Sequence, residues 1–371
     1  MKKATMLLLF LWLLAGCQTV IHQGDNVEQK TMSIIHKELS PSFLTQKIQH
    51  IPYGRVASVH GFIGDDTIVY SSIRERWHVK TMSLETGEIT SIYQTENPIV
   101  TVRPDPHFMY TFMEEKTPNG GSLITIVNND GKVIHQQSIQ ALETDWNWNS
   151  FQKGSGVLTA YLEEGASSVT NIHIQEDEVI DSPLPVHAYN KWMNEHQLIS
   201  FNWGKGLNLV ADLELYDTLT GTTTTFERDV LAFEAQKAYY MIVRPEGEND
   251  KGTLHFQFWD KQTSEIVASF SIPMLQTHSG HYWLPSYDWN PDTNHFYTFA
   301  PKRSASVLEY NEPYELIQFS IDRNREEVIV TDTTHTPIVC STNNLCLVGE
   351  RGTKVLHVPS GVIQHVEEGE R

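Results

Sequence analysis

The strongest constraint on the fold is a repeat of turn signals along the chain. Tight hairpin turns recur between strands of alternating polarity, and their central residues are separated by 44, 46, 44, 42, 61 and 37 residues. These residues are Gly87, Gly131, Asp177, Gly221, Thr263, Asn324 and Gly361. Glycine suits such turns because tight hairpins require positive φ angles. A second kind of turn, which joins one apolar strand to the next, occurs once between successive hairpins. Counting hairpins and counting these turns therefore give the same number of repeat units.

The repeat predicts an all-β fold. By both counts the chain holds seven units of about 44 residues, each with four short strands. A period of this length with four strands is typical of a β-propeller blade. We therefore expect a β-propeller of four-stranded blades, seven by repeat count. Six blades plus a partial closing unit are the alternative, because the last unit, residues 336–366, is atypical. A β-sandwich gives no reason for a fixed period.

One blade turn carries a recognisable motif. Residues 289–292 read WNPD before an aromatic strand, and residues 103–110 (RPDPHFMY) and 146–149 echo them. These strings resemble the Trp-Ser-Pro-Asp-Gly motif of TolB-like propellers, although no glycine follows Asp292. The whole chain with its leader is similar to the YqgU-like family of bacterial lipoproteins, which implies a six-bladed propeller, one blade fewer than the repeat count. We interpret the motif as structural, with Trp packed between blades and Asn or Asp bonded to the turn backbone.

The first residues predict export and lipidation. Two lysines precede a run at residues 4–14 that would reach only about 16 Å as a helix, half of a bilayer core, so residues 1–16 are expected to be a signal peptide. The string LAGC resembles the lipobox of bacterial lipoproteins, which makes Cys17 the lipidated residue. An ordinary signal peptide with a nearby cysteine is the alternative. We expect a lipid-anchored tether at residues 17–42, the propeller at 43–371, and a location on the extracytoplasmic side of the cell membrane.

The charge balance excludes one class of partner. The chain has 46 Asp and Glu against 27 Lys and Arg, a formal charge of −19, or −21 once Lys2 and Lys3 leave with the signal peptide. Such a polyanion does not suit nucleic acid, because neutralising phosphates requires Lys and Arg. The chain has no phosphate-binding loop, zinc-protease motif or dinucleotide fingerprint, so we expect no cofactor and assign no catalytic residue.

Two cysteines predict a local disulfide. Cys340 and Cys346 flank a five-residue connection at an expected hairpin, which brings their side chains within bridging reach on neighbouring strands. An exported location favours oxidation. Closing a ring of about seven residues would stabilise the fold by roughly 2.4 kcal/mol in the chain-entropy model. Two unpaired core cysteines are the alternative.

Two long insertions indicate where a binding face would lie. The recurrent turns are nearly all tight and share one face of a propeller, so residues 273–283 and 301–312 fall on the opposite face. The candidate binding residues there are His278, His281, Tyr282, Trp283, Lys302, Arg303 and Tyr310. Lys302 and Arg303 form a positive spot in an acidic chain, which would suit an anion or an acidic partner. Loops without a function are the alternative.

The same insertion contains the nearest approach to a metal motif. His278 and His281 are spaced by three residues and would reach one ion, but the sequence offers no third ligand. We therefore predict no metal site, with both histidines solvated in a loop.

These observations favour a non-enzymatic role. We expect a membrane-anchored lipoprotein whose propeller is a scaffold that binds a protein, peptide or glycan partner in the cell envelope. The alternative is a hydrolase or lyase of an envelope polymer. That enzyme would need carboxylates or histidines with perturbed pKa values, converging on the propeller axis from the innermost strands.

Overall fold

The computed structural model describes the chain in separate ranges. These are residues 33–34, 56–64, 66–72, 77–84, 86, 88–104, 110–139, 146–152, 157–162, 168–173, 178–183, 190–194, 196–203, 210–217, 219–247, 251–277, 280–290, 292–341, 344–349 and 354–365. The predicted signal peptide, the predicted lipidation site Cys17 and the candidate residue His278 lie outside the described residues.

Antiparallel sheets of four strands make up nearly all of this structure, which confirms the all-β propeller prediction. The described strands form six such sheets and a seventh that a short fifth strand extends, and all seven are numbered here in chain order. Sheet one holds β2 (Val56–Phe62), β3 (Thr67–Ser72), β4 (His78–Ser83) and β5 (Ile89–Gln94); sheet two holds β6 (Ile99–Pro104), β7 (Tyr110–Lys116), β8 (Ser122–Asn128) and β9 (Val133–Ile139); sheet three holds β10 (Trp146–Gln152), β11 (Val157–Leu162), β12 (Ser168–His173) and β13 (Glu178–Pro183).

The remaining sheets follow the same order along the chain. Sheet four holds β14 (Asn190–Asn194), β15 (Gln197–Asn202), β16 (Ala211–Asp217) and β17 (Thr222–Val230); sheet five holds β18 (Ala232–Ala235), β19 (Tyr239–Glu246), β20 (Thr253–Asp260) and β21 (Ile266–Pro273); sheet six holds β24 (Tyr287–Asn290), β25 (His295–Ala300), β27 (Tyr314–Ser320) and β28 (Arg325–Thr333); sheet seven holds β29 (Val339–Cys340), β30 (Leu345–Val348), β31 (Lys354–His357) and β32 (Val362–His365). A short strand from the predicted tether, β1 (Ser33–Ile34), adds in parallel to β28.

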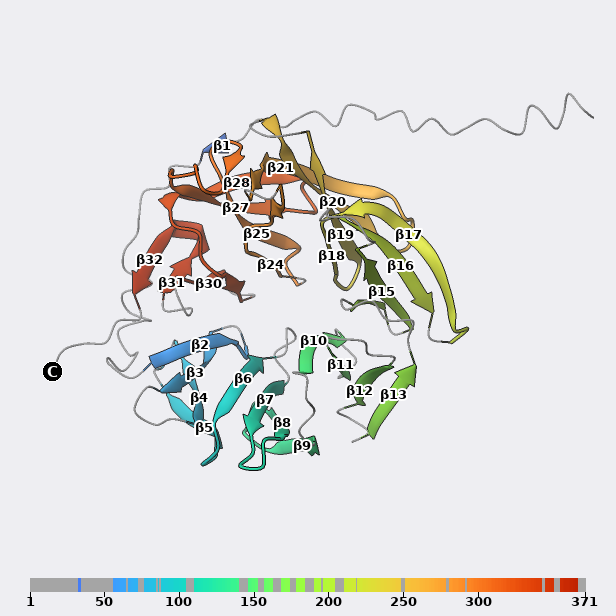
Figure 1. Ribbon diagram of the computed structural model, residues 1–371. Helices are drawn as coiled ribbons and strands as arrows, with labels where there is room; N and C mark the ends of the chain where they lie inside the picture. Colours follow the sequence, from blue (N-terminus) through green and yellow to red (C-terminus); the bar gives the residue numbers. More distant parts are fainter. Residues whose placement is uncertain are drawn as a thin grey trace, which may run out of the picture. The chain divides into compact units, whose positions relative to one another are not determined.

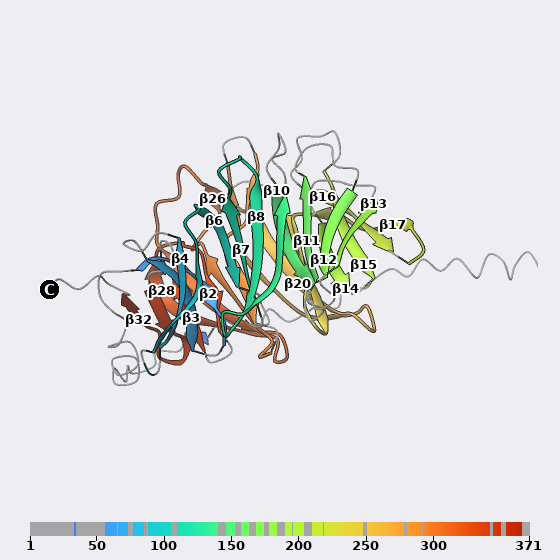
Figure 2. The same cartoon turned by 90° about the horizontal axis from the view of Figure 1, so that it is seen from below.

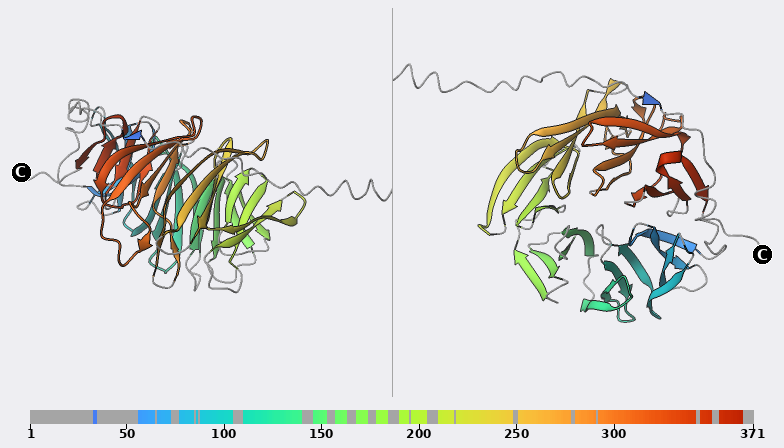
Figure 3. Two further views of the ribbon diagram at one scale, coloured as in Figure 1. Left: turned by 90° about the horizontal axis from the view of Figure 1, so that it is seen from above. Right: turned by 180° about the vertical axis from the view of Figure 1, so that it is seen from behind.

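The sheets stand around a common axis within residues 32–371, which form one compact unit (Figure 1). First strands of neighbouring sheets contact one another, including β2 with β6, β14 with β18, and β24 with β29. The first strand of each sheet is therefore the innermost one, and Figure 3 shows the same arrangement from above and from behind.

The strands run between two faces of this ring, as the side view shows (Figure 2). Turns between the first and second strands, and between the third and fourth strands, lie on one face, which we call the hairpin face. The remaining connections, including both long insertions, lie on the other face, which we call the insertion face.

The core lies between neighbouring sheets because successive side chains of a strand point to opposite faces. In β20 the buried residues alternate, and Leu254, Phe256 and Phe258 are all fully buried. They share one cluster with Trp289 of sheet six, whose ring meets Phe258 edge-on at 5.3 Å between centroids. This packing confirms the structural reading of the Trp-containing blade turn.

Apolar contacts also join the last sheet to the first. Leu345 and Leu347 of sheet seven share a buried cluster with Phe62 and Ile68 of sheet one, and β29 contacts β2. Within sheet seven, Cys340 pairs directly with Cys346 across β29 and β30, and the two form a disulfide. The predicted bridge is therefore confirmed.

The turn signals behave as their chemistry predicts. Gly131, Gly221, Asn324 and Gly361 all have positive φ angles, between 45° and 76°. In the blade turn of sheet six, the Asn290 side-chain oxygen accepts hydrogen bonds from the backbone N–H groups of Asp292 at 3.0 Å and Thr293 at 3.2 Å. Side-chain bonding of this kind stabilises a turn without help from distant residues.

Helical structure is scarce in the described part of the chain. The 3₁₀ turn η3 (Val358–Ser360) links β31 to β32. Among the described residues no helix has the length and apolar character that crossing a bilayer requires.

Candidate functional site

The two long insertions meet in a small sheet of their own, which we call the insertion sheet. It consists of β22 (Leu275–Gln276), β23 (Tyr282–Trp283) and β26 (Ala305–Ser306). Strand β22 pairs antiparallel with β23 and in parallel with β26. The N–H of Val307 donates to the carbonyl of Gln276 at 2.7 Å. The insertions predicted from the repeat spacing are thus held together by backbone hydrogen bonds.

The base of the insertion sheet is fixed to sheet five. The Ser304 hydroxyl donates to the carbonyl of Gly252 at 2.6 Å, and the same oxygen accepts from the N–H of Met274 at 3.3 Å. A Cβ atom at Gly252 would meet the Met274 Cε at 2.1 Å, so glycine at this position lets the Met274 side chain lie against the backbone of sheet five. The insertion sheet is therefore a buttressed element rather than two independent loops.

Aromatic rings pack behind the insertion sheet. Trp283 lies 4.6 Å from His335 and 5.8 Å from Tyr314, between ring centroids, and Tyr310 lies 5.0 Å from Tyr314. The His335 Nε2 accepts a hydrogen bond from the N–H of Ser286 at 2.9 Å. Burial lowers the pKa of His335, which favours the neutral imidazole. Trp283 and Tyr310 thus join one cluster as expected, and the sequence reading missed Tyr314 and His335.

The two cations of the insertions are each paired with a carboxylate. Lys302 forms an ion pair with Asp332, and Arg303 Nε lies 2.5 Å from a Glu312 oxygen. The Arg303 guanidinium also lies over the Tyr310 ring, 5.9 Å from its centroid. Both positive charges expected from the sequence are therefore balanced locally, so these two residues do not by themselves make a positive patch.

An exposed leucine marks the tip of the second insertion. Leu308 is 78% exposed, in a turn where the N–H groups of Glu309 and Tyr310 both donate to the Ser306 carbonyl at 3.0 Å. Single exposed apolar side chains are common on protein surfaces, so Leu308 provides an accessible apolar side chain on the insertion face and is not by itself evidence of a contact. Leu308 was not among the binding residues predicted from the sequence, although it is an apolar residue in a polar insertion and could have been recognised by that contrast.

The predicted absence of a metal site stays untested as a whole. His281 donates its backbone N–H to the Thr277 hydroxyl at 3.0 Å, in the turn that joins β22 to β23. Among the described residues no group of three His, Cys, Asp or Glu side chains is placed to hold an ion.

A second polar group forms near the axis, from the innermost strands of three successive sheets. We call Lys191 of β14, Glu234 of β18 and Tyr287 of β24 the axial triad. The Lys191 Nζ lies 2.5 Å from a Glu234 oxygen and also hydrogen-bonds Tyr287. The neighbouring Asp288 accepts the N–H of Cys340 at 2.7 Å, which extends the polar contacts to sheet seven. No local pattern in the sequence indicates this group, because its members lie far apart along the chain.

The electrostatics of the axial triad keep two of its members, Lys191 and Tyr287, protonated. Burial lowers the pKa of Lys191, but the Glu234 carboxylate more than offsets this and raises it above the ordinary value. Burial raises the pKa of Tyr287. Both groups therefore stay protonated near neutral pH, and neither can serve there as a general base.

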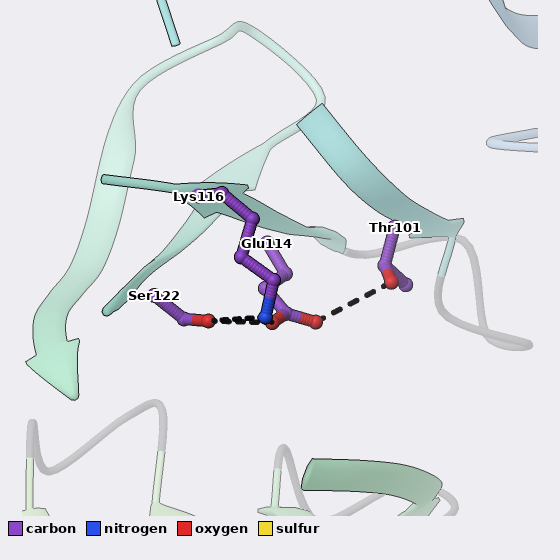
Figure 4. A network of polar contacts seen from close by, with 4 residues as sticks. All are labelled: Thr101, Glu114, Lys116 and Ser122. Carbon is purple, nitrogen blue, oxygen red and sulfur yellow. Dashed lines mark hydrogen bonds and ion pairs between the residues drawn. The ribbon is translucent and has the colours of Figure 1, made fainter. Parts of the chain in front are cut away.

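Two adjacent buried carboxylates on β7 are the other candidates for chemistry. Glu114 accepts hydrogen bonds from Ser122 at 2.7 Å, Lys116 at 3.2 Å and Thr101 at 3.4 Å (Figure 4). Because neighbouring residues of a strand point to opposite faces, Glu115 points away from Glu114.

Glu115 is bound in its own network. Its carboxylate accepts from the hydroxyl groups of Tyr93 and Thr95 and from the Asn97 amide at 3.1 Å, which links sheet two to sheet one. Both carboxylates accept hydrogen bonds from neighbouring donors and point away from each other. They therefore do not form the facing pair of carboxylates that hydrolysis of a glycosidic polymer uses.

Comparisons with known proteins agree with this architecture. Uncharacterized protein lmo1340 from Listeria monocytogenes EGD-e is similar in structure, with a TM-score of 0.72 and 18% identity over 90% of this chain and 96% of that one. A chain of the mitotic checkpoint complex has a TM-score of 0.45 and 11% identity over 89% of this chain and 95% of its own, and the Sif2 C-terminal WD40 domain has a TM-score of 0.43 and 9% identity over 80% and 95%. No curated protein sequence matches the chain.

The family comparison covers most of the chain. The family described as "YqgU-like 6-bladed beta propeller domain" matches residues 83–349. This range runs from the end of β4 to the end of sheet seven's second strand, β30. The chain therefore belongs to the YqgU-like family of β-propeller domains.

Proposed function

We propose that this protein is a lipid-anchored, extracytoplasmic propeller that binds a partner in the cell envelope through its insertion face, without turning it over. The partner is a protein, peptide or glycan. The observation that carries this proposal is the insertion sheet, because it joins both long insertions on a buttressed base and holds Leu308 in solvent. A preformed surface of this kind binds at a lower entropic cost than free loops.

Four of the polar groups described above favour binding over catalysis. Lys191 and Tyr287 stay protonated near neutral pH, and the buried Glu114 and Glu115 are satisfied by neighbouring donors. A hydrolase or lyase would instead need a group able to accept a proton beside the substrate.

Seven blades are the finer form of the fold that we propose. The family description names six, but its match to residues 83–349 spans five whole sheets, from two to six, and only parts of sheets one and seven. The shared core of sheets one and seven, including Phe62 and Leu345, supports closure of the ring by the seventh sheet.

The anchor is tested at Cys17. Metabolic labelling of cells with a fatty-acid analogue should tag the wild-type protein and not Cys17→Ala, because the lipobox thiol is the acceptor of the diacylglyceryl group. Two or more acyl chains would hold the propeller stably at the membrane, whereas one chain would bind only marginally. An unlabelled wild-type protein released as a soluble product would contradict the anchor.

The binding face is tested by photo-crosslinking in living cells. A benzophenone amino acid at position 308 should form a defined adduct, because the Leu308 side chain is exposed on the insertion face. Leu219 is the matched control, since it is 73% exposed in the β16–β17 hairpin on the opposite face.

The comparison between the two positions decides the outcome. An adduct of one size from position 308 and none from position 219 supports the insertion face. The same adducts from both positions, or an adduct from position 219 alone, would place the partner elsewhere.

A further inference from the structure

The axial triad occupies a place where a ligand would meet protein on several sides. Lys191, Glu234 and Tyr287 come from the innermost strands of sheets four, five and six, and propeller blades surround a central channel. The Lys191 side chain keeps 29% of its surface accessible and Glu234 keeps 20%, although protein atoms crowd the Lys191 ammonium group. A side chain that lines a channel has protein atoms around it and still keeps part of its surface accessible, as Lys191 does.

The triad retains hydrogen-bonding capacity. A lysine ammonium has three N–H donors, and Lys191 uses one toward Glu234 and one toward Tyr287, which leaves one without a partner among the described residues. Tyr287 accepts from Lys191, so its own hydroxyl proton also remains available. The Tyr287 ring is held by stacking on Phe296, at 5.3 Å between centroids. Two donors from two different sheets are thus presented in fixed positions.

The charges of the triad select against ions. Glu234 cancels the charge of Lys191, and the chain as a whole carries −19, so an anionic ligand gains little attraction here and meets long-range repulsion. A cation would meet the Lys191 ammonium group. The triad therefore suits a neutral ligand that is rich in oxygen.

We propose that the axial triad binds a neutral saccharide. Sugar hydroxyl groups both accept and donate, so one accepts from Lys191 or Tyr287 while its neighbour donates to Glu234. Tyr287 is the first residue of β24 and follows the insertion sheet through residues 284–286, which places it at the insertion-face end of its strand. The proposal rests on the binding function above and deepens it by naming a glycan as the ligand.

Calorimetric titration of the full-length protein tests this site. The probes are the neutral tetrasaccharides of glucose, N-acetylglucosamine and mannose. At least one should bind the wild type, and Tyr287→Phe should weaken it about fivefold, the usual net effect of losing one hydrogen bond. Tyr287→Phe keeps the ring on Phe296 but removes one acceptor of Lys191, so the protein should still unfold cooperatively, with a melting temperature a few degrees lower. Tyr216→Phe, at the hairpin end of β16 and outside both the triad and the insertion face, should bind as the wild type does.

Each failure has a distinct meaning. If none of the three tetrasaccharides binds, or if Tyr287→Phe binds equally well, the axial site is refuted, and an adduct at position 308 would still support the insertion face. If a tetrasaccharide binds in a Tyr287-dependent way but position 308 forms no adduct, the axial site stands and the insertion face does not.

Discussion

Replacing Trp289 with alanine should lower the free energy of unfolding by about 3–5 kcal/mol, the usual cost of truncating a large buried aromatic residue. Trp289 is 4% exposed and lies between sheets five and six, in the cluster that includes Phe258 and Phe296. The cavity left by the indole would open the core between two neighbouring sheets. Urea unfolding followed by circular dichroism measures the loss.

Trp289→Phe is the matched control. Phenylalanine keeps an aromatic ring against Phe258, and the Trp289 Nε1 has no hydrogen-bond partner among the described residues, so its removal costs little. We expect this variant to lose less than half as much stability as Trp289→Ala. Equal losses would contradict the expectation that an aromatic ring packed against Phe258 carries most of this stability.

Acid should destabilise the protein through His60. Burial lowers the pKa of His60 from 6.5 to about 4, and its Nε2 lies 2.6 Å from the Ser71 hydroxyl oxygen. Because the folded pKa lies below the unfolded one, the unfolded chain takes up the proton first as the pH falls. This contribution to stability is present above about pH 6.5 and is lost toward pH 4, by up to about 3 kcal/mol at roughly 1.4 kcal/mol per pKa unit.

The variant His60→Gln isolates this effect, because glutamine can still hydrogen-bond Ser71 but does not titrate. Its unfolding free energy should fall less than that of the wild type between pH 7 and pH 4. His78→Gln is the control for the substitution itself, since His78 contacts Ser91 at 2.6 Å at an exposed position of the same sheet. Parallel curves for wild type and His60→Gln would refute the assignment.

Local chemistry explains why so much of the fold was predictable. A hairpin with a positive φ angle favours glycine, as at Gly131 and Gly221. A blade turn whose side chain bonds the turn backbone favours asparagine, as at Asn290. Single residues therefore indicate the repeat. The Cys340–Cys346 disulfide was also a local prediction, because both residues flank one hairpin. Such turns and the disulfide depend on a few neighbouring residues and do not depend on how distant parts of the chain pack.

The candidate sites were less predictable because they depend on contacts between sheets. Glu234 lies 43 residues from Lys191 along the chain, and no local pattern announces their ion pair. Lys302 likewise forms an ion pair with a distant residue, Asp332. The sequence predicted a positive spot at Lys302 because no local pattern indicates this partner. The insertion lengths did predict that both insertions share a face, but not that β22 and β26 pair directly.

The most direct test of the binding proposal is amide hydrogen exchange of the full-length protein with and without the partner purified from the position 308 adduct. The proposal predicts slower exchange at residues 274–277 and 305–310, whose backbone groups build the insertion sheet. Exchange in the opposite hairpins, at residues 219–222 and 261–265, should not change. Slower exchange confined to those hairpins, with none in the insertion sheet, would contradict the proposal.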